Sequence, residues 1–454
     1  MDRVVGGRGR SLSALALPVL VLAAATAPAS AQSSPPQYSI VELSGVPQRL
    51  NDNGQIAGWV FVGANAHAAV YSGGAWHDLG VPAGDQLSAL YGINSAGAVV
   101  GVSFATLPGF PFPDNRWQGI WAPAGATTVQ ALSVLAPDSF NYAINDSGTI
   151  VGCLNRYDDV YPDPHRAFLY ANGSVTDLHH LLSPPATQTP FDFTCARDVN
   201  NAGDIVGEVE LFGSAKRGFV YRSGVVSRLE QGASYLANAR AISNLGKVVG
   251  EGRRIGFSAD HAVVYDVATG AISSLGLEST GAYNSRPNDV NTLGDVVGMM
   301  FLGVGEHAFL ASAGQVYDLN DLIPAGSDWV LQEAFSINDH GQIVGRGYRT
   351  SSPSVTRYFL MESTSPEVAL ANLIAQVRAL QSASFLGKGS ATALVAMLQV
   401  ADRLLGMDKG WAAVHTLEVF VRNVDVLVRT NRLSPTNGQP LIDEGDRIVD
   451  LLTS

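Results

Sequence analysis

The stretch AINDSGTIVG at residues 143–152 is one of seven near copies of the same phrase in this chain of 454 residues. Other copies read GINSAGAVVG, DVNNAGDIVG, AISNLGKVVG, DVNTLGDVVG and SINDHGQIVG, and the first copy contains NDNG at 51–54. Asn favours turns because its side chain bonds the backbone two residues on, and Gly accepts a positive φ, so each phrase predicts a tight hairpin turn between two short strands. The turn glycines recur 43 to 55 residues apart: Gly54, Gly97, Gly148, Gly203, Gly246, Gly294 and Gly341. A unit of that length, present seven times, indicates a propeller or another repeat array.

Each copy contains two further short strands after the hairpin. The third strand is seen as HAAVY at 67–71, HRAFLY at 165–170 and HAFL at 307–310, and the fourth as WHDLG at 76–80 or QVYDL at 315–319. Four strands in about 48 residues are typical of one propeller blade, whereas a parallel β-helix needs a shorter coil and helical arrays need a 3.6-residue period that is missing here. The sequence therefore predicts a mainly β fold, a seven-bladed β-propeller over residues 37–362.

The two ends of the array suggest how the ring closes. The last copy ends with RYFLM at 357–361 and lacks a fourth strand, while an orphan strand, YSIVEL at 38–43, precedes the first copy. We expect this N-terminal strand to complete the last blade, which leaves no open sheet edge. In the alternative phase, seven complete units form without any exchange of strands.

The repeat pattern gives way to a helical pattern after Ser365, and Ser365-Pro366 is typical of the start of a helix. Apolar residues then recur on one helical face in three stretches, and a shorter fourth helix is predicted to follow Pro440. Residues 365–454 are therefore predicted to form a small α-helical bundle. Their apolar faces suit a core, the alternative being a docking groove.

The repeat phrase followed by H-A-F-L-Y resembles the HAF-repeat proteins, described as probable extracellular repeats. The resemblance spans about residues 37–362, although the second copy has QGIW at 118–121 and copies four and seven carry Arg217 and Arg357 in the His position. The tail is similar to the helical FIMAH domain through HTLEVFVRNVDVLVRTNRLS at 415–434. These resemblances imply a fold and an extracellular location, and no activity.

The first 31 residues are typical of a secretory signal peptide. Arg3, Arg8 and Arg10 precede an apolar run at 14–25, and Ala29-Ser30-Ala31 supplies a cleavage site. The run is too short for a membrane span, an uncleaved anchor being the alternative. We expect a secreted, periplasmic or cell-surface protein with no membrane span. The net charge of −12 with no basic cluster argues against a nucleic-acid partner.

Few residues point to chemistry. In an exported chain Cys153 and Cys195 are candidates for one disulfide, the alternative being two buried thiols. The histidines that open the third strand, His67, His261 and His307, are expected to bond within their own blade or to the next one rather than to share a metal. NDNG and NDSG lack the later acidic ligands of a calcium loop, so no cofactor is predicted, with calcium kept as an unproven candidate. GxSxG, HExxH and P-loop motifs are absent from the sequence.

Two insertions between the second and third strands of neighbouring blades, residues 105–117 and 155–165, interrupt the repeat. They gather aromatic and acidic side chains, which suit sugar binding: Phe110, Phe112, Trp117, Tyr157, Asp158, Asp159, Tyr161 and Asp163. Packing of each loop against its own blade is the alternative.

Three hypotheses about function follow. The first is a secreted, non-enzymatic binding scaffold whose partner is an extracellular glycan or protein. The second is a polysaccharide-acting lyase or glycoside hydrolase with its site at the mouth of the channel, where carboxylates from several blades would have to converge. The third is a structural role in the cell surface or matrix.

Overall fold

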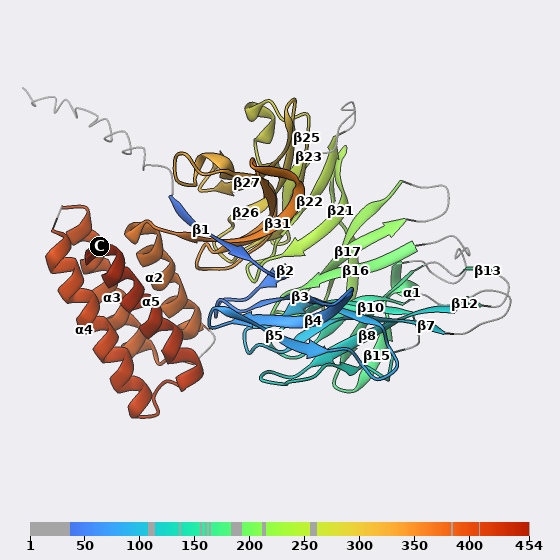
Figure 1. Cartoon of the computed structure of the whole chain (residues 1–454), viewed down its shortest axis with the longest axis horizontal. Helices are drawn as coiled ribbons and strands as arrows, with labels where there is room; N and C mark the ends of the chain where they lie inside the picture. The colour runs from blue at the N-terminus through green and yellow to red at the C-terminus, as the bar shows by residue number, and fades with distance from the viewer. Residues whose placement is uncertain are drawn as a thin grey trace, which may run out of the picture. The chain divides into compact units, whose positions relative to one another are not determined.

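The computed structural model describes residues 37–453 except 108–113, 136–137, 155–156, 159–160, 163–164, 183–192, 211–214, 255–260, 383–384 and 408. The predicted signal peptide, residues 1–31, lies outside these residues. Figure 1 shows antiparallel sheets for most of the chain and a group of helices at its C-terminal end.

The sheets are the blades of a seven-bladed β-propeller, as predicted. Blade 1 contains β2 (Val46–Leu50), β3 (Ile56–Val62), β4 (Asn65–Ser72) and β5 (Ala75–Gly80); blade 2 contains β6 (Leu87–Ile93), β7 (Val99–Leu107), β8 (Asp114–Ala122) and β9 (Gln130–Ala131). Blade 3 contains β10 (Ser139–Ile144), β11 (Ile150–Leu154), β14 (Arg166–Ala171) and β15 (Ser174–Asp177); blade 4 contains β16 (Phe193–Val199), β17 (Ile205–Glu210), β18 (Arg217–Arg222) and β19 (Val225–Arg228).

Blade 5 contains β21 (Ser234–Ile242), β22 (Lys247–Arg254), β23 (His261–Asp266) and β24 (Ala271–Ser274), with β20 (Glu230–Gln231) beside β21. Blade 6 contains β25 (Asn284–Val290), β26 (Val296–Leu302), β27 (Gly305–Ser312) and β28 (Gln315–Asp318); blade 7 contains β29 (Trp329–Ile337), β30 (Ile343–Arg349) and β31 (Ser352–Ser363). Short elements lie between these strands: β12 (Tyr157–Asp158), β13 (Tyr161–Pro162), α1 (His179–Leu182), η1 (Leu277–Thr280) and η2 (Leu319–Asp321).

The ring closes through the N-terminal strand, which confirms the expected exchange. β1 (Tyr38–Leu43) pairs antiparallel with β31, from Tyr38 opposite Ser363 to Leu43 opposite Tyr358, and becomes the outermost strand of blade 7. Figure 1 shows β1 in blue beside the orange β31. The strands therefore join residues about 320 positions apart.

The hydrophobic core lies between neighbouring blades. One cluster, for example, joins Ala241, Val249 and Ala262 of blade 5 to residues of blade 6 that include Phe309. The aromatic ring of the HAF triplet and its counterparts is fully buried in four blades: Phe168, Phe219, Phe309 and Phe359. The triplet thus marks the core side of each third strand.

The Asn of each repeat phrase both shapes its turn and ties its blade to the next one. In blade 3, the Oδ1 of Asn145 accepts from the backbone N–H groups of Ser147 and Thr149 at 3.1 and 2.9 Å, while Gly148 adopts a φ of 78°. The Nδ2 of Asn145 donates to the carbonyl of Asn200 in blade 4 at 3.0 Å.

The same link of 3.0–3.2 Å runs from six of the seven turns to the following turn, donated by Asn51, Asn94, Asn145, Asn200, Asn291 and Asn338. We call this ring of amide bonds the Asn belt. Its gap lies after Ser243, whose hydroxyl accepts from the N–H of Lys247 at 3.2 Å and, among the described residues, makes no bond to the next turn.

Every innermost strand contains a β-bulge at the same place, three residues before the belt position. The bulged residues are half-buried among buried neighbours: Gln48, Tyr91, Tyr142, Arg197, Arg240, Asn288 and Phe335. Opposite each bulge lies the second Gly of the phrase; a Cβ at Gly152, for instance, would overlap the carbonyl oxygen of Phe140. A bulge redirects a side chain, and here it lets seven variable residues line the channel.

Two of the three repeated histidines, His67 and His307, bond within their own blades as expected, whereas the Nδ1 of His261 has no hydrogen-bond partner among the described residues. The Nδ1 of His67 lies 3.1 Å from a carboxylate oxygen of Asp78, and that of His307 lies 2.5 Å from Asp318. In blade 4 both positions hold arginine, Arg217 and Arg228, and Arg217 instead stacks over the ring of Tyr235 at 3.6 Å.

Four C-terminal helices form a bundle: α2 (Pro366–Ser382), α3 (Lys388–Leu405), α4 (Gly410–Arg429) and α5 (Pro435–Thr453). All four contribute to one buried core that includes Leu373, Leu398, Phe420 and Ile448. The last helix begins at Pro435, before Pro440 and not after it, because Pro435 occupies the first turn, where its missing N–H costs nothing. Among the described residues, no helix is long and apolar enough to cross a membrane.

Candidate functional site

The channel at the centre of the ring has two ends of different size. The narrow mouth, a cavity of about 140 Å³, is lined by the repeat turns. The wide mouth, about 490 Å³, lies at the other end of the innermost strands and is lined by the bulged residues together with Glu208, Lys216, Asn238, Arg286 and Glu333. Each innermost strand runs from the wide mouth to its repeat turn at the narrow mouth, and the second strand runs back. The hairpin between the second and third strands therefore lies on the same face as the wide mouth.

Arg49 separates the two ends. Its guanidinium lies 2.8 Å from Asp198 and 3.2 Å from Asp289, so one side chain of blade 1 binds blades 4 and 6 across the channel. The carboxylates also accept backbone N–H bonds, from Ile242 to Asp198 and from Ile337 to Asp289.

Burial disfavours the charged forms of Arg49 and Asp289, and the ion pairs between them favour these charged forms. Burial would lower the pKa of Arg49, but Asp198 and Asp289 outweigh it and raise that pKa above its usual value. Burial raises the pKa of Asp289, although Arg49 and Ser336 act against it. Arg49 lines both mouths of the channel, and its two ion pairs connect blade 1 to blades 4 and 6.

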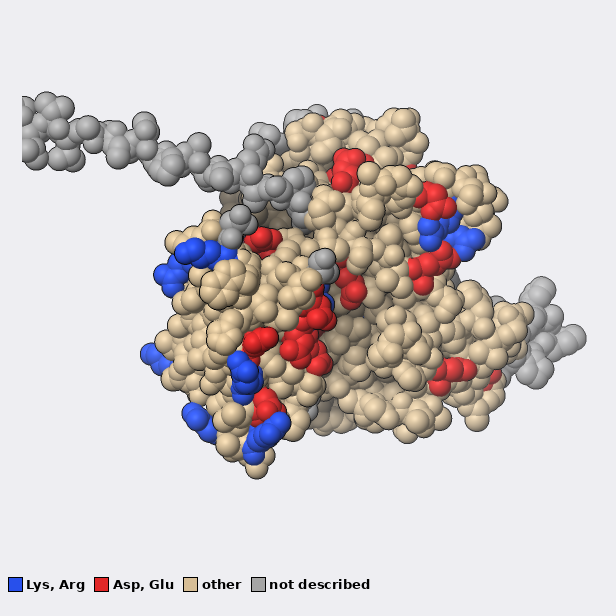
Figure 2. Space-filling model, turned by 60° about the vertical axis from the view of Figure 1, so that its left-hand side comes forward, with Lys and Arg blue, Asp and Glu red and all other residues tan. Residues whose placement is uncertain are grey.

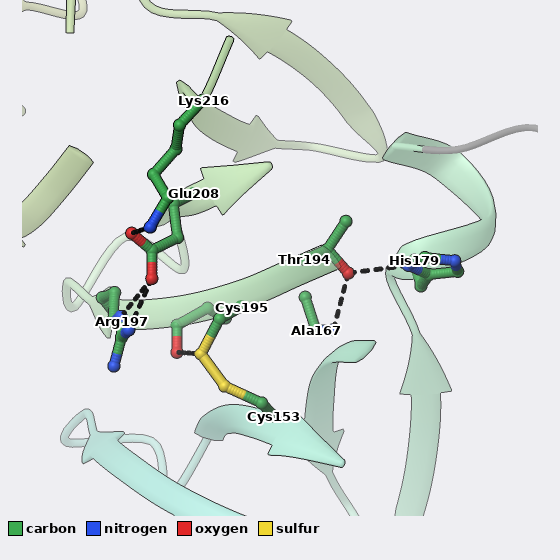
Figure 3. Close-up of a disulfide and its surroundings, with 9 residues drawn as sticks. Cys153, Ala167, His179, Thr194, Cys195, Arg197, Glu208 and Lys216 are labelled. Atoms are coloured by element: carbon green, nitrogen blue, oxygen red, sulfur yellow. Dashed lines mark hydrogen bonds and ion pairs between the residues drawn. A yellow bond between two sulfur atoms is a disulfide. The ribbon is translucent and has the colours of Figure 1, made fainter. Parts of the chain in front are cut away.

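One side of the wide mouth, formed by blades 4 to 6, carries ion pairs. Arg197 donates through Nε and Nη2 to Glu208, whose other oxygen lies 3.3 Å from Lys216 (Figure 3). In blade 5, Arg240 binds Glu251 at 2.9 and 2.7 Å through the same two nitrogens.

Glu333 joins blades 6 and 7. It accepts from Arg286 at 2.5 Å and from Arg346 at 2.9 Å, while Asn288 donates to it at 3.0 Å. Burial works to raise the pKa of Glu208 and of Glu333, but the neighbouring cations outweigh it and hold both pKa values below the ordinary one. Both carboxyl groups are therefore ionised at neutral pH.

The other side of the wide mouth is aromatic. Tyr91 and Tyr142 lie with ring centroids 6.0 Å apart, and the guanidinium of Arg197 lies 4.7 Å from the Tyr142 centroid. A row of rings continues outward from Tyr142 through Phe140 to Trp117, at 6.4 and 5.4 Å. Flat aromatic faces beside guanidinium groups suit a ligand that has both an apolar face and polar substituents.

The sequence-predicted ligand residues are only partly described. Phe110, Phe112, Asp159 and Asp163 lie outside the described residues. The backbone of Tyr157, Asp158 and Tyr161 forms the small β12–β13 ribbon, with Asp158 opposite Tyr161. Trp117 is placed, and its ring packs against Phe104 at 4.8 Å and Phe140 at 5.4 Å, at the outer end of the aromatic row.

Sequence reasoning did not single out the residues of the wide mouth itself. Their signal was the position three residues before the belt Asn, which holds a large side chain in every copy, either Gln, Tyr, Arg, Asn or Phe. Variation at a fixed structural position is typical of a surface that is free of packing constraints.

A disulfide lies beside residues of this site. Cys153 of β11 and Cys195 of β16 are joined, with Cα atoms 5.0 Å apart, and link blade 3 to blade 4 (Figure 3). Cys195 is two residues from Arg197 and opposite Glu208 in the strand register. The crosslink therefore holds the strand that supplies one ion pair of the wide mouth.

The narrow mouth carries carboxylates of a different kind. The N–H of Asp339 donates to Asp52 at 2.9 Å, and that of Thr292 donates to Asp339 at 2.7 Å. Burial, with Asp52 next in effect, raises the pKa of Asp339 to about 6. Burial also raises the pKa of Asp52. Within the described part of the chain, no group of three or more His, Cys, Asp or Glu side chains is arranged to hold a metal ion.

Comparison with known proteins adds likeness of fold alone. No protein-family model and no curated protein matches the chain. Among solved structures, the β-propeller domain of the Trilobed protease from Pyrococcus furiosus matches with a TM-score of 0.46 and 8% identity, over 72% of this chain and 97% of that one. A prolyl endopeptidase structure matches at 0.47 and 11% identity over 72% of this chain and 50% of its own. A β-fructofuranosidase from Bombyx mori gives 0.28 and 10% identity, over 73% and 91%.

Proposed function

We propose that this chain is a secreted, non-enzymatic binding protein of the HAF-repeat type that holds an extracellular ligand in the wide mouth of its propeller. The observation that carries the proposal is the cavity of about 490 Å³ with aromatic rings on one side and guanidinium groups on the other. Pockets of roughly 300–1,000 Å³ with a few convergent polar groups are the usual size of ligand sites in proteins. A carbohydrate fits this lining, because tyrosine rings stack on sugars and the polar groups bind hydroxyls.

The state of the carboxylates supports binding over hydrolysis at this mouth. A glycoside hydrolase needs one carboxyl group with a raised pKa as general acid. Glu208 and Glu333 have lowered pKa values and are held by arginines, so they are structural partners of the cations.

The test is binding of residues 32–454 to a broad array of glycans and polysaccharides, with calcium and with EDTA. We expect a specific hit that Tyr91→Ala weakens and Tyr283→Ala leaves unchanged. Tyr283 is the matched control because its side chain is exposed beside blade 6 and does not line the cavity. Equal binding by both variants, or a hit lost only on removal of residues 105–117 and 155–165, would place the site on the insertions instead.

A second function, a polysaccharide-acting lyase or hydrolase, is favoured by one observation at the narrow mouth. Asp52 and Asp339 are neighbouring carboxyl groups with raised pKa values, and such a pair can divide the roles of acid and base. If the protein releases product from a glycan that it binds on the array, and Asp339→Asn abolishes this release, an enzymatic function is favoured over a binding function.

The remaining parts of the proposal concern location and the tail. We propose export through the N-terminal signal, and a FIMAH-like role for residues 365–454 in attachment to another extracellular protein. Calcium stays a candidate ligand, which the EDTA arm of the array tests.

A further inference from the structure

We infer that the ligand of the wide mouth is an anionic sugar chain, one whose rings carry an oxyanion such as a carboxylate or a sulfate. The inference rests on the proposed function and names the class of ligand. It is carried by the orientation of the ion pairs, by the polar atoms left without partners, and by the aromatic wall opposite them.

The ion pairs present their positive ends to the cavity. The side chains of Glu208, Glu251 and Glu333 are 6–9% exposed, whereas those of Arg197, Arg240 and Arg286 are 33–34% exposed. Each pair is neutral as a whole, but the carboxylate lies in the wall and the guanidinium lies at the surface. A bound group therefore meets the field of three cations, and Lys216, 35% exposed, adds a fourth.

The guanidinium groups of Arg240 and Arg286 are also held in place with nitrogens left over. Arg197 and Arg240 bind their glutamates through Nε and Nη2, and Arg286 binds Glu333 through Nη2. Among the described residues, the hydrogen bonds of Arg240 and Arg286 do not involve Nη1, whereas Arg197 also interacts with Tyr142. Guanidinium groups bind oxyanions through charge-assisted hydrogen bonds, and a fixed guanidinium loses little entropy when it does so.

Three buried polar atoms around blades 5 and 6 have no partner among the described residues: Asn238 Oδ1, Glu251 Oε2 and Arg286 Nε. Asn238 and Glu251 are opposite each other in the strand register. Buried polar atoms are rarely left unsatisfied, because each costs about 1–3 kcal/mol. Two acceptors opposite each other in blade 5 and one donor in neighbouring blade 6 can bind the hydroxyl groups of a sugar.

The aromatic wall of Tyr91 and Tyr142 requires that the ligand also have a flat apolar face, which an inorganic anion lacks. The rest of the protein disfavours polyanions, since the chain has a net charge of −12. Figure 2 shows one face on which Asp and Glu gather near the centre while most Lys and Arg lie toward the edges. A polyanion should therefore be held at the wide mouth and repelled elsewhere.

The test compares polymers that differ in charge alone. Affinity of residues 32–454 is measured by calorimetry for polygalacturonate, for the same polymer after reduction of its carboxyl groups, for dextran sulfate and for dextran. We expect polygalacturonate or dextran sulfate to bind at least about tenfold more tightly than its neutral counterpart, and the pair that shows the difference identifies the oxyanion.

Two variants locate the effect. Arg240→Gln should weaken binding of the anionic polymer about tenfold and leave any binding of the neutral polymer unchanged, whereas Arg222→Gln, an exposed arginine of blade 4, should change neither. Arg240→Lys keeps the charge, guards against misfolding caused by an unpaired Glu251, and should fall between them.

The outcomes separate the two proposals. Equal affinity for charged and neutral polymers, or full affinity in Arg240→Gln, would overturn the inference and leave the binding function standing. If the protein binds none of the four polymers and no glycan on the array, both the inference and the proposed binding function are overturned.

Discussion

Replacing Ser243 by Asn should close the Asn belt and stabilise the propeller. In six blades the Asn donates to the next turn at 3.0–3.2 Å, and its Oδ1 accepts a turn N–H at 2.8–3.0 Å. Among the described residues, the hydroxyl of Ser243 makes one bond, a 3.2 Å contact with the N–H of Lys247, and the carbonyl of Asn291 receives no amide donor from blade 5. The backbone of this turn already has the belt geometry, because Gly246 adopts a φ of 74° and Asn200 donates to the Ser243 carbonyl.

The size of the effect follows from the bonds gained. A net hydrogen bond contributes about 0.5–1.5 kcal/mol, and the variant adds one between blades and shortens one in the turn. After the entropy of fixing the Asn side chain, about 1 kcal/mol should remain. For domains of 150–250 residues that corresponds to about 2–4 °C in Tm, so a gain of roughly 2 °C is expected here.

Thermal unfolding followed by circular dichroism measures this gain, with Asn200→Ser as the mirror variant. Asn200→Ser removes the 3.2 Å bond to the Ser243 carbonyl and should lower Tm by a similar amount or more. If Asn200→Ser lowers Tm while Ser243→Asn leaves it unchanged, the value of the Asn lies in its own turn, and the reasoning about links between blades is refuted.

Three further predictions concern the crosslink, the bulge and the narrow mouth. Replacing Cys153 and Cys195 by Ala should cost roughly 4 kcal/mol in urea unfolding, from the loop of about 42 residues that the disulfide closes, and weaken ligand binding at the wide mouth; unchanged stability would contradict this. Gly152→Ala should destabilise blade 3 by several kcal/mol because its Cβ would overlap the Phe140 carbonyl, while Gly63→Ala, whose Cβ meets no neighbour, should cost only the strain of its positive φ. Asp339 favours the protonated form in the folded protein, since its pKa of about 6 lies above the ordinary 3.8, so its contribution to stability falls as pH rises from about 4 to 6. Asp339→Asn should therefore raise Tm most above pH 7 and least near pH 4; a gain independent of pH would refute the role of the charge.

The architecture was predictable because it is repeated. Seven turn phrases predicted seven blades, and a last copy without its fourth strand predicted the exchange of β1, since an unpaired edge is costly wherever it occurs. The start of α5 was placed too late, because Pro440 reads as a helix breaker although it is tolerated within the helix here.

The site was not predictable in the same way. The reading of Asn as a turn residue was right, but its Nδ2 also bonds a turn 43 to 55 residues away, a contact that local pattern cannot show. The second Gly of each phrase looked like an ordinary strand residue until the bulge opposite it was seen. Arg49 shows the limit most clearly: it is one of seven equivalent positions, and its partners Asp198 and Asp289 are brought to it only by closure of the ring.

The pairing of β1 with β31 has a consequence for how the molecule is made. Residues 38–43 are synthesised before the rest of the propeller and must wait for residues 358–363, so blades 1 to 6 can fold before the ring is shut. The entropic cost of closing a loop grows only with the logarithm of its length, so a separation of about 320 residues destabilises the closed ring only modestly. Contacts between residues this distant in sequence are nevertheless slow to form. Closure of the ring is thus expected to be the last and slowest step of folding, and until it occurs Arg49 in blade 1 has not met its carboxylates in blades 4 and 6.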